Sequence, residues 1–169
     1  MVDTAKDLAH GGLRMLRMQL SDVDDVLAIE QSVYAHPWSR SGFVDSLRNS
    51  DDAWVARNAG GELIGYVVQM TVIDESHLLT IAVKGSLQRQ GFGLALLRFA
   101  IQRAHTMNMK SMMLEVRVSN LRALQMYRKF GFVQIGQRKN YYQADHQQRE
   151  DALILRCPIS SQDNGYVGQ

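Results

Sequence analysis

The stretch LQRQGFGLALL, from Leu87 to Leu97, places two glycines behind polar residues and ahead of an apolar, helix-like segment. Gln88, Gly91 and Gly93 form the pattern Q-x-x-G-x-G at a predicted strand-to-helix turn. Backbone N–H groups in such a turn can converge on one anion, with the positive end of the next helix behind them, so the pattern suits a pyrophosphate. Glycine is needed because a side chain would hold the phosphate away from the backbone. A tight turn that only begins a helix is the alternative interpretation.

Two familiar nucleotide motifs are absent from this stretch. No Lys-Ser or Lys-Thr pair follows the second glycine, as a triphosphatase loop requires, and no third glycine stands at the dinucleotide spacing. The pattern therefore predicts phosphate binding outside these two classes, and Arg89 can add positive charge to the loop.

Two further side chains are of types that transfer protons. Glu115 lies in the apolar stretch MMLEV, where an ionisable side chain requires either an ion-pair partner or a functional role. It is a candidate general base, or else a salt-bridged side chain with Arg117 as its partner. Tyr127 follows Asn120 by two helical turns, which places both on one helix face, and asparagine is also a residue type that caps a helix. On spacing alone, a core aromatic whose hydroxyl meets a backbone carbonyl is the more common role for such a tyrosine.

The expected elements form an α/β (α+β) fold, with a mixed sheet and about four helices. Ser21 is predicted to cap the first helix and Ser39 the second. The strand at 77–83 is nearly all apolar, which predicts burial on both faces, and a loop is expected at 139–149. Strands are expected over 13–20, 53–58, 63–73, 77–83, 111–118, 132–139 and 150–156, and helices over 22–34, 40–47, 94–104 and 121–130.

Composition favours one globular domain, at 13–159, between flexible polar tails at 1–12 and 160–169. The chain has 169 residues and is 46% hydrophobic, and its net charge of +2 is too small to indicate a nucleic-acid binder. Cys157 is the single cysteine, which excludes an intramolecular disulfide, and the five histidines never stand at metal-ligand spacing, so no metal is expected. The sequence shows no signal peptide and no apolar run long enough to span a membrane, which predicts a soluble, cytoplasmic protein.

The glycine pattern and the later residues Asn120, Ala123, Tyr127, Gly131 and Phe132 resemble the GNAT acyltransferase superfamily over nearly the whole domain. The resemblance implies that acetyl-CoA is the cosubstrate, that Glu115 is the base and Tyr127 the acid, and that the fourth and fifth strands splay apart. Backbone groups of the fourth strand would then bind pantetheine and polarise the acetyl carbonyl. The implied cofactor-binding residues are Ile81, Ala82, Val83, Gln88, Arg89, Gln90, Gly91, Phe92, Gly93 and Asn120.

Within the superfamily, the segments LEVRVSN, RKNYY and REDALIL are similar to the bacterial enzymes that acetylate the N-terminal alanine of a small-subunit ribosomal protein. This similarity implies that Tyr141 and Tyr142 contact the acceptor peptide. Trp38 either shapes the peptide slot or covers the core. The chain departs from the pattern at Gln143, where proline is expected, and this affects the shape of the 139–149 loop.

Three functions remain open from the residues alone. They are acetylation of a protein N-terminus, acetylation of a lysine side chain or small amine, and non-catalytic sensing of acyl-CoA. Retention of both Glu115 and Tyr127 argues against the sensor. No nucleic-acid or membrane partner is expected, and a monomer is compatible with the sequence.

Overall fold

The computed structural model describes residues 12–144 and 148–160. Most of the two expected tails, 1–12 and 160–169, and residues 145–147 of the expected loop lie outside this range. Seven strands form one sheet in the order β1-β2-β3-β4-β5-β7-β6. The elements are β1 (Arg14–Arg17), a 3-10 turn (Leu20–Asp22), α1 (Val23–Val33), α2 (Arg40–Arg48), β2 (Asp52–Arg57), β3 (Leu63–Val72), β4 (Glu75–Val83), a 3-10 turn (Gly85–Leu87), α3 (Phe92–Thr106), β5 (Ser111–Arg117), α4 (Leu121–Lys129), β6 (Val133–Gln143) and β7 (Arg149–Pro158).

The sheet is mixed, as the sequence predicts. β4 pairs with β5 in parallel, whereas the β1–β2, β2–β3, β5–β7 and β6–β7 pairs are antiparallel. The register of the parallel pair runs from Glu75–Ser111 to Leu78–Leu114, while the strands themselves continue to Val83 and Arg117. The splay of these two strands beyond Leu78 stays a prediction.

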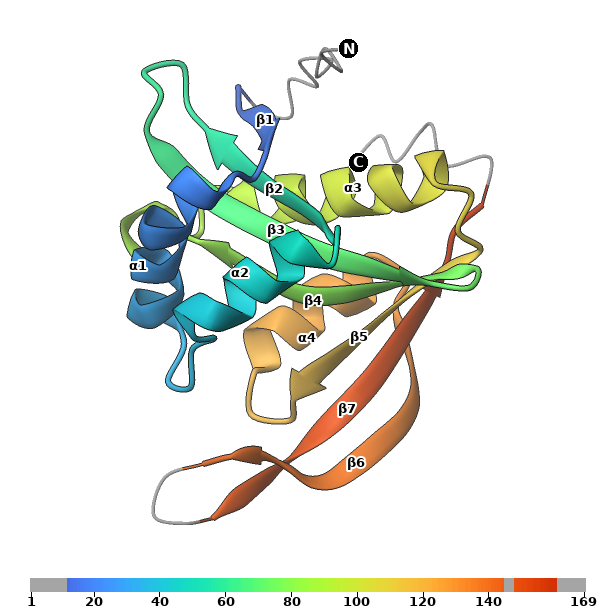
Figure 1. Ribbon diagram of the computed structural model, residues 1–169. Helices are drawn as coiled ribbons and strands as arrows, with labels where there is room; N and C mark the ends of the chain where they lie inside the picture. Colours follow the sequence, from blue (N-terminus) through green and yellow to red (C-terminus); the bar gives the residue numbers. More distant parts are fainter. Residues whose placement is uncertain (1–11, 145–147, 161–169) are drawn as a thin grey trace. The chain divides into compact units, whose positions relative to one another are not determined.

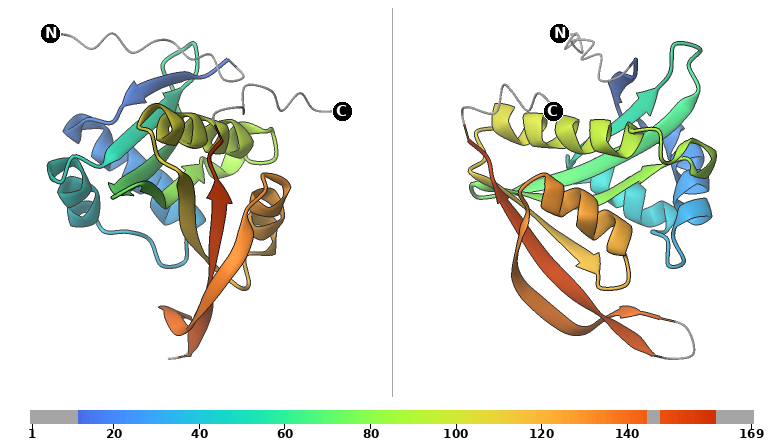
Figure 2. Two further views of the ribbon diagram at one scale, coloured as in Figure 1. Left: turned by 90° about the vertical axis from the view of Figure 1, so that its right-hand side faces the viewer. Right: turned by 180° about the vertical axis from the view of Figure 1, so that it is seen from behind.

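The chain divides into two compact units, of which the first contains the residues up to Met70 together with Leu79–Ala100. In this unit α1 and α2 lie on one side of the strands and the first part of α3 lies on the other (Figure 2). The apolar spacing of α1 explains its packing, because Val23, Val26 and Ile29 recur on one face and are buried. They join Phe43, Tyr66 and Val68 in the core beneath the two helices.

The two helix caps expected from the sequence have different outcomes. Ser39 caps α2, since its Oγ accepts the Gly42 N–H at 3.1 Å. Ser21 does not cap α1, because a 3-10 turn precedes the helix and Asp22 takes the cap position. The Asp22 carboxylate accepts the Gln19 N–H at 2.8 Å and pairs with Arg57 at 2.7 Å, and these contacts hold the tighter turn in place.

β4 is buried mainly on one face, which corrects the expectation of burial on both. Its residues alternate, with Ser76, Leu78, Thr80 and Ala82 buried and the intervening side chains half-buried. One of the latter, Leu79, packs against the edge of the core. The nearly continuous apolar sequence of β4 is therefore explained by partial burial of the second face of the strand.

Gly65 on β3 marks a close approach to β4. A methyl group there would collide with the Ala82 carbonyl oxygen and lie 3.0 Å from Leu96 Cδ1. Because the obstacle is backbone, we expect Gly65→Ala to lower the free energy of unfolding by about 2 to 3 kcal/mol. Gly85→Ala is the control, since a methyl group at Gly85 meets nothing within 4 Å. Urea unfolding midpoints for the two variants measure the difference, and equal midpoints would contradict the close approach.

The second unit comprises Thr71–Leu78 and the residues from Ile101 onward. β6 and β7 form a long twisted hairpin, with β7 paired to β5 (Figure 1). The strand β6 continues to Gln143, so residues 139–143 of the expected loop are strand. Between Arg138 and Tyr142 the register shifts, and four residue steps on β6 match two on β7. This bulge absorbs the extra residues, which is why a break in the strand pattern at 139 does not end the strand.

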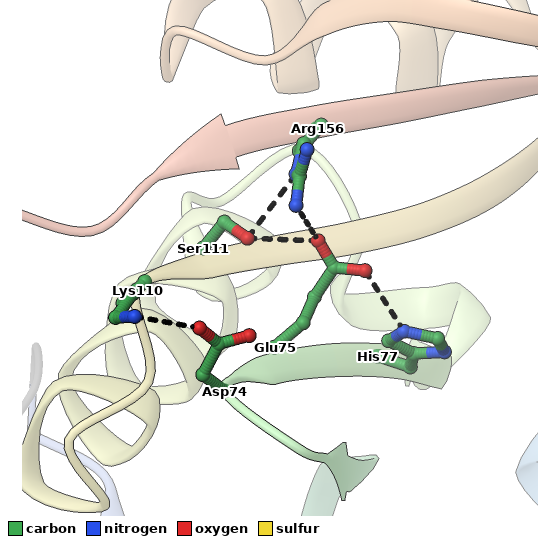
Figure 3. Close-up of polar contacts among 6 residues, drawn as sticks. All are labelled: Asp74, Glu75, His77, Lys110, Ser111 and Arg156. Carbon is green, nitrogen blue, oxygen red and sulfur yellow. Dashed lines mark hydrogen bonds and ion pairs between the residues drawn. The ribbon is translucent and has the colours of Figure 1, made fainter.

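A polar cluster joins the first residues of β4 and β5 (Figure 3). Glu75 accepts the Ser111 hydroxyl at 2.8 Å, pairs with Arg156 at 2.6 Å and contacts His77 Nε2 at 3.1 Å. Burial acts to raise the pKa of Glu75, but the hydrogen bonds from Ser111, His77 and Arg156 outweigh it, and the pKa is lowered. Alongside, Lys110 pairs with Asp74 at 2.8 Å. These contacts connect β4 and β5 at the residues where their parallel pairing begins.

The Glu75 contacts predict an acid-sensitive contribution to stability. A carboxyl whose pKa is lowered on folding stabilises the protein above its unfolded pKa, about 4.3, and loses this effect as the pH falls through the folded value. We expect Glu75→Gln to lower the free energy of unfolding by about 1 to 3 kcal/mol at pH 7. Urea titrations of both proteins should converge near pH 3. A constant difference from pH 7 to pH 3 would contradict the ionic origin.

Candidate functional site

The glycine loop, Gln88–Gly93, follows β4 after the 3-10 turn Gly85–Leu87 and leads into α3, as the sequence predicts. Arg89 and Gly91 have positive φ values of 64° and 87°. The Gln88 side-chain amide donates to the Val83 carbonyl at 3.3 Å, which ties the loop to the end of β4. Gly93 lies in the first turn of α3, where backbone N–H groups have no acceptor within the helix. The loop thus combines the backbone shape and the helix N-terminus that an anion site requires.

The end of β4 carries the residues expected to contact pantetheine. Ala82 and Val83 are buried, whereas Ile81 is half-buried. The Ile81 carbonyl accepts the Tyr34 hydroxyl at 2.6 Å. Tyr34 was not among the predicted site residues, although it belongs to the aromatic segment YAHPWS that contains Trp38.

Trp38 packs against the core of the first unit. Its ring lies 5.2 Å from the Phe43 ring, and its backbone N–H donates to Glu30 Oε1 at 2.9 Å. The side chain is half-buried, which supports its interpretation as a cover of the core.

In the second unit, Glu115 is surrounded by residues of β6. Its Oε1 lies 2.9 Å from Arg138 Nε. The charge of Glu115, with burial and a hydrogen bond between the two groups, raises the pKa of Tyr141. Burial, with the charge of Glu115 next, raises the pKa of Tyr142 to about 12. The two tyrosine rings meet edge to face at 5.1 Å. One carboxylate and two protonated phenols therefore form a single group.

Arg117 is not the partner of Glu115, which corrects that expectation. It pairs with Glu150 at 3.3 Å, donates to the Gln143 carbonyl at 2.8 Å and lies over the Tyr142 ring at 4.4 Å. Glu115 and Arg117 are both on β5, but β6 and β7 present a closer partner to each. Arg138 was missed because its position opposite β5 depends on the hairpin register.

α4 positions Asn120 and Tyr127. Asn120 caps the helix, since its Oδ1 accepts the Ala123 N–H at 3.2 Å. Tyr127 is buried, with 6% of its surface exposed, and its ring packs against Phe132 at 5.6 Å. Gly131, at φ 92°, follows the end of the helix and lets the chain turn back into β6. Asn120 as helix cap, Tyr127 as a buried ring and Gly131 as the turn each have a structural role in this motif.

Neither a metal-binding cluster nor a membrane-spanning helix is found in the described residues. Across residues 12–144 and 148–160, no group of three or more His, Cys, Asp or Glu side chains could hold a metal ion. Within the same ranges, no helix is both long and apolar enough to cross a membrane.

A seven-stranded mixed sheet with a glycine-containing loop between β4 and α3 is the arrangement of a known class of acyl-transferring enzymes. The chain belongs to the acetyltransferase (GNAT) family, whose model matches residues 23–132. The resemblance seen in the sequence is thereby confirmed, and acetyl-CoA is the acetyl donor of such enzymes.

The relatives of the chain include enzymes named as N-terminal acetyltransferases. The chain is 34% identical, over 85% of its length and 95% of the relative, to the ribosomal protein bS18-alanine N-acetyltransferase of Escherichia coli (strain K12). It is 29% identical, over 86% of its length and 93% of the relative, to an N-alpha-acetyltransferase of Sulfurisphaera tokodaii. The crystal structure of the ribosomal-protein-S18-alanine N-acetyltransferase from Escherichia coli matches with a TM-score of 0.81 at 32% identity, covering 91% of this chain and 99% of that one.

Proposed function

We propose that the protein transfers the acetyl group of acetyl-CoA to the free N-terminal amine of ribosomal protein bS18, whose first residue would be alanine. The observation that carries the proposal is the group formed by Glu115, Tyr141 and Tyr142. Its two tyrosines belong to the segment RKNYY, which is similar to the enzymes that acetylate an N-terminal alanine. The similarity to N-terminal acetyltransferases over most of the chain supports the same acceptor.

The donor would bind along the first unit. The pyrophosphate would meet the backbone N–H groups of Gln88–Gly93, and Arg89 would add its charge. The pantetheine arm would run beside the backbone of Ile81–Val83. Asn120 would contact the arm through its amide nitrogen, because its oxygen caps α4.

The reaction needs a base, an acid and a polarised carbonyl. The amine nitrogen attacks the thioester carbon, the carbon–sulfur bond breaks, and the sulfur leaves with the bonding electrons. In the proposed mechanism the Glu115 carboxylate receives the amine proton, directly or through water, and the Tyr127 hydroxyl gives a proton to the departing thiolate. A backbone N–H of β4 would polarise the acetyl oxygen.

Aromatic side chains would contact the acceptor. Tyr141 and Tyr142 would contact the peptide from β6, and Trp38 would contact it from the segment between α1 and α2. Both phenols have raised pKa values and stay protonated at neutral pH, so they can donate hydrogen bonds to peptide carbonyls. Arg138 would orient the Glu115 carboxylate.

The proposal is tested with two peptides of equal composition. One has a free N-terminal alanine, and the other has a blocked N-terminus and an internal lysine. Acetyl-CoA-dependent mass gain on the first peptide alone is the expected result. Mass gain on the second peptide alone would indicate that the acceptor is a side-chain amine. Binding of acetyl-CoA without mass gain on either peptide would indicate a small-molecule amine as acceptor, or a non-catalytic acyl-CoA sensor.

A further inference from the structure

Glu30, near the end of α1, is a buried acid with partners on three other segments. It is 2% exposed. Its Oε1 accepts the Trp38 N–H at 2.9 Å, and its Oε2 contacts the hydroxyls of Tyr66 on β3 and Thr80 on β4, the latter at 3.4 Å. Burial raises the pKa of Glu30, although the bonds from Trp38 and Thr80 act against this. Burial of a carboxyl is costly, so its position needs a reason beyond packing.

Glu30 holds both ends of the segment Tyr34–Ser39, which joins α1 to α2 (Figure 1). Its backbone carbonyl accepts the Tyr34 N–H at 3.0 Å, while its side chain accepts the Trp38 N–H. One residue therefore closes the segment into a loop. Ser39 then caps α2, so the segment has a fixed exit as well as a fixed entry.

The closed segment presents an aromatic side chain beside β4. The Tyr34 hydroxyl donates to the Ile81 carbonyl at 2.6 Å, and 36% of Tyr34 remains exposed. Ile81 belongs to the stretch beside which the pantetheine arm would run. A ligand bound beside this stretch of β4 would therefore lie close to Tyr34.

We infer that Glu30 is a positioning residue, which fixes the segment Tyr34–Ser39 against β4 through its contact with the Trp38 N–H and so forms one wall of the acceptor site. The inference rests on the proposed function for the identity of the acceptor. Hydrogen-bonding capacity, and not charge, performs this role. A glutamine side chain keeps an oxygen for the Trp38 N–H and can donate to Tyr66 and Thr80, whereas methionine fills similar space without these bonds.

Steady-state kinetics of Glu30→Gln and Glu30→Met test the inference. For Glu30→Met we expect the KM for the free-alanine peptide to rise about tenfold, with the KM for acetyl-CoA within about twofold of wild type. Glu30→Gln should keep both KM values within about twofold. Asp52→Leu is the matched control, because Asp52 is also buried and holds Trp54, Gln69 and Arg17 on β2, β3 and β1.

A second measurement does not depend on the acceptor. In a Trp54→Phe background, Trp38 is the single remaining tryptophan of the two. Acrylamide should quench its fluorescence more strongly in Glu30→Met than in Glu30→Gln or in the parent. Equal quenching in all three proteins would overturn the inference even if the peptide proves not to be the substrate.

The kinetic outcomes distinguish failure of the proposed function from failure of the positioning role of Glu30. Absence of mass gain on the peptide with wild-type protein would reject the proposed function and leave the quenching result to decide the role of Glu30. Equal losses in Glu30→Gln and Glu30→Met, or a rise in peptide KM in Asp52→Leu as large as that in Glu30→Met, would overturn the positioning role.

Discussion

Glu115→Gln is expected to lower kcat by about 10² to 10⁴-fold at neutral pH, because an amide cannot accept the amine proton. An N-terminal amine has a pKa of about 8 and an ordinary glutamate about 4.3, so direct transfer is uphill by about 5 kcal/mol. A turnover of about 10 per second corresponds to a barrier of about 16 kcal/mol, which accommodates this step. The wild-type rate should rise with pH as the amine of the acceptor deprotonates.

The effect of Glu115→Gln should be confined to catalysis. The ion pair with Arg138 is largely exposed on the arginine side, and such pairs contribute about 1 kcal/mol or less. Stopped assays of kcat from pH 6 to 9, with a urea titration alongside, provide the measurement. Glu75→Gln is the control, since Glu75 also pairs with an arginine in the same unit but has no role in the proposed reaction. A kcat for Glu115→Gln equal to wild type across this range would remove Glu115 from the mechanism.

Tyr127→Phe is expected to lower kcat by about 10²-fold, with little change in the KM for acetyl-CoA. A thiol has a pKa of about 8.5 and a tyrosine about 10, so the phenol can protonate the thiolate at a cost of about 2 kcal/mol. Phenylalanine keeps the ring that packs against Phe132, so the fold should be retained.

The leaving group gives Tyr127→Phe a specific test. An acetyl donor whose thiol has a pKa several units lower needs no acid, because its thiolate departs unprotonated. The kcat ratio of wild type to variant should therefore fall toward one with such a donor. A ratio that stays constant between the two donors would show that Tyr127 acts on binding or packing instead.

Features determined by neighbouring residues were predictable from the sequence. The glycine loop, the caps by Ser39 and Asn120, and the apolar face of α1 each depend on contacts within a few residues. The positive φ of Gly91 follows from the turn in the same way. The mixed sheet was also predictable, because its strands are separated by clear turns and helices.

Features determined by distant residues were not predictable in this way. The Glu115–Arg138 pair joins β5 to β6 and depends on the register of the final hairpin. Helical spacing places Glu30 on the apolar face of α1 with Val23 and Val26, but its contacts with Tyr66 and Thr80 depend on strands that are distant in the sequence. The exposed acids Asp24 and Asp25 lie on the opposite face of the same helix.

The bulge in β6 makes chain length a determinant of the proposed acceptor site. Side chains of adjacent strand residues normally point to opposite faces, yet Tyr141 and Tyr142 have rings in contact and both respond to the charge of Glu115. Asn140, at φ 51° and bonded through its N–H to Asp151, sets this departure from regular geometry. Loss of one residue there would send the two phenols apart without altering either, so insertions and deletions in this hairpin offer evolution a route to new acceptors that leaves the composition of the site unchanged.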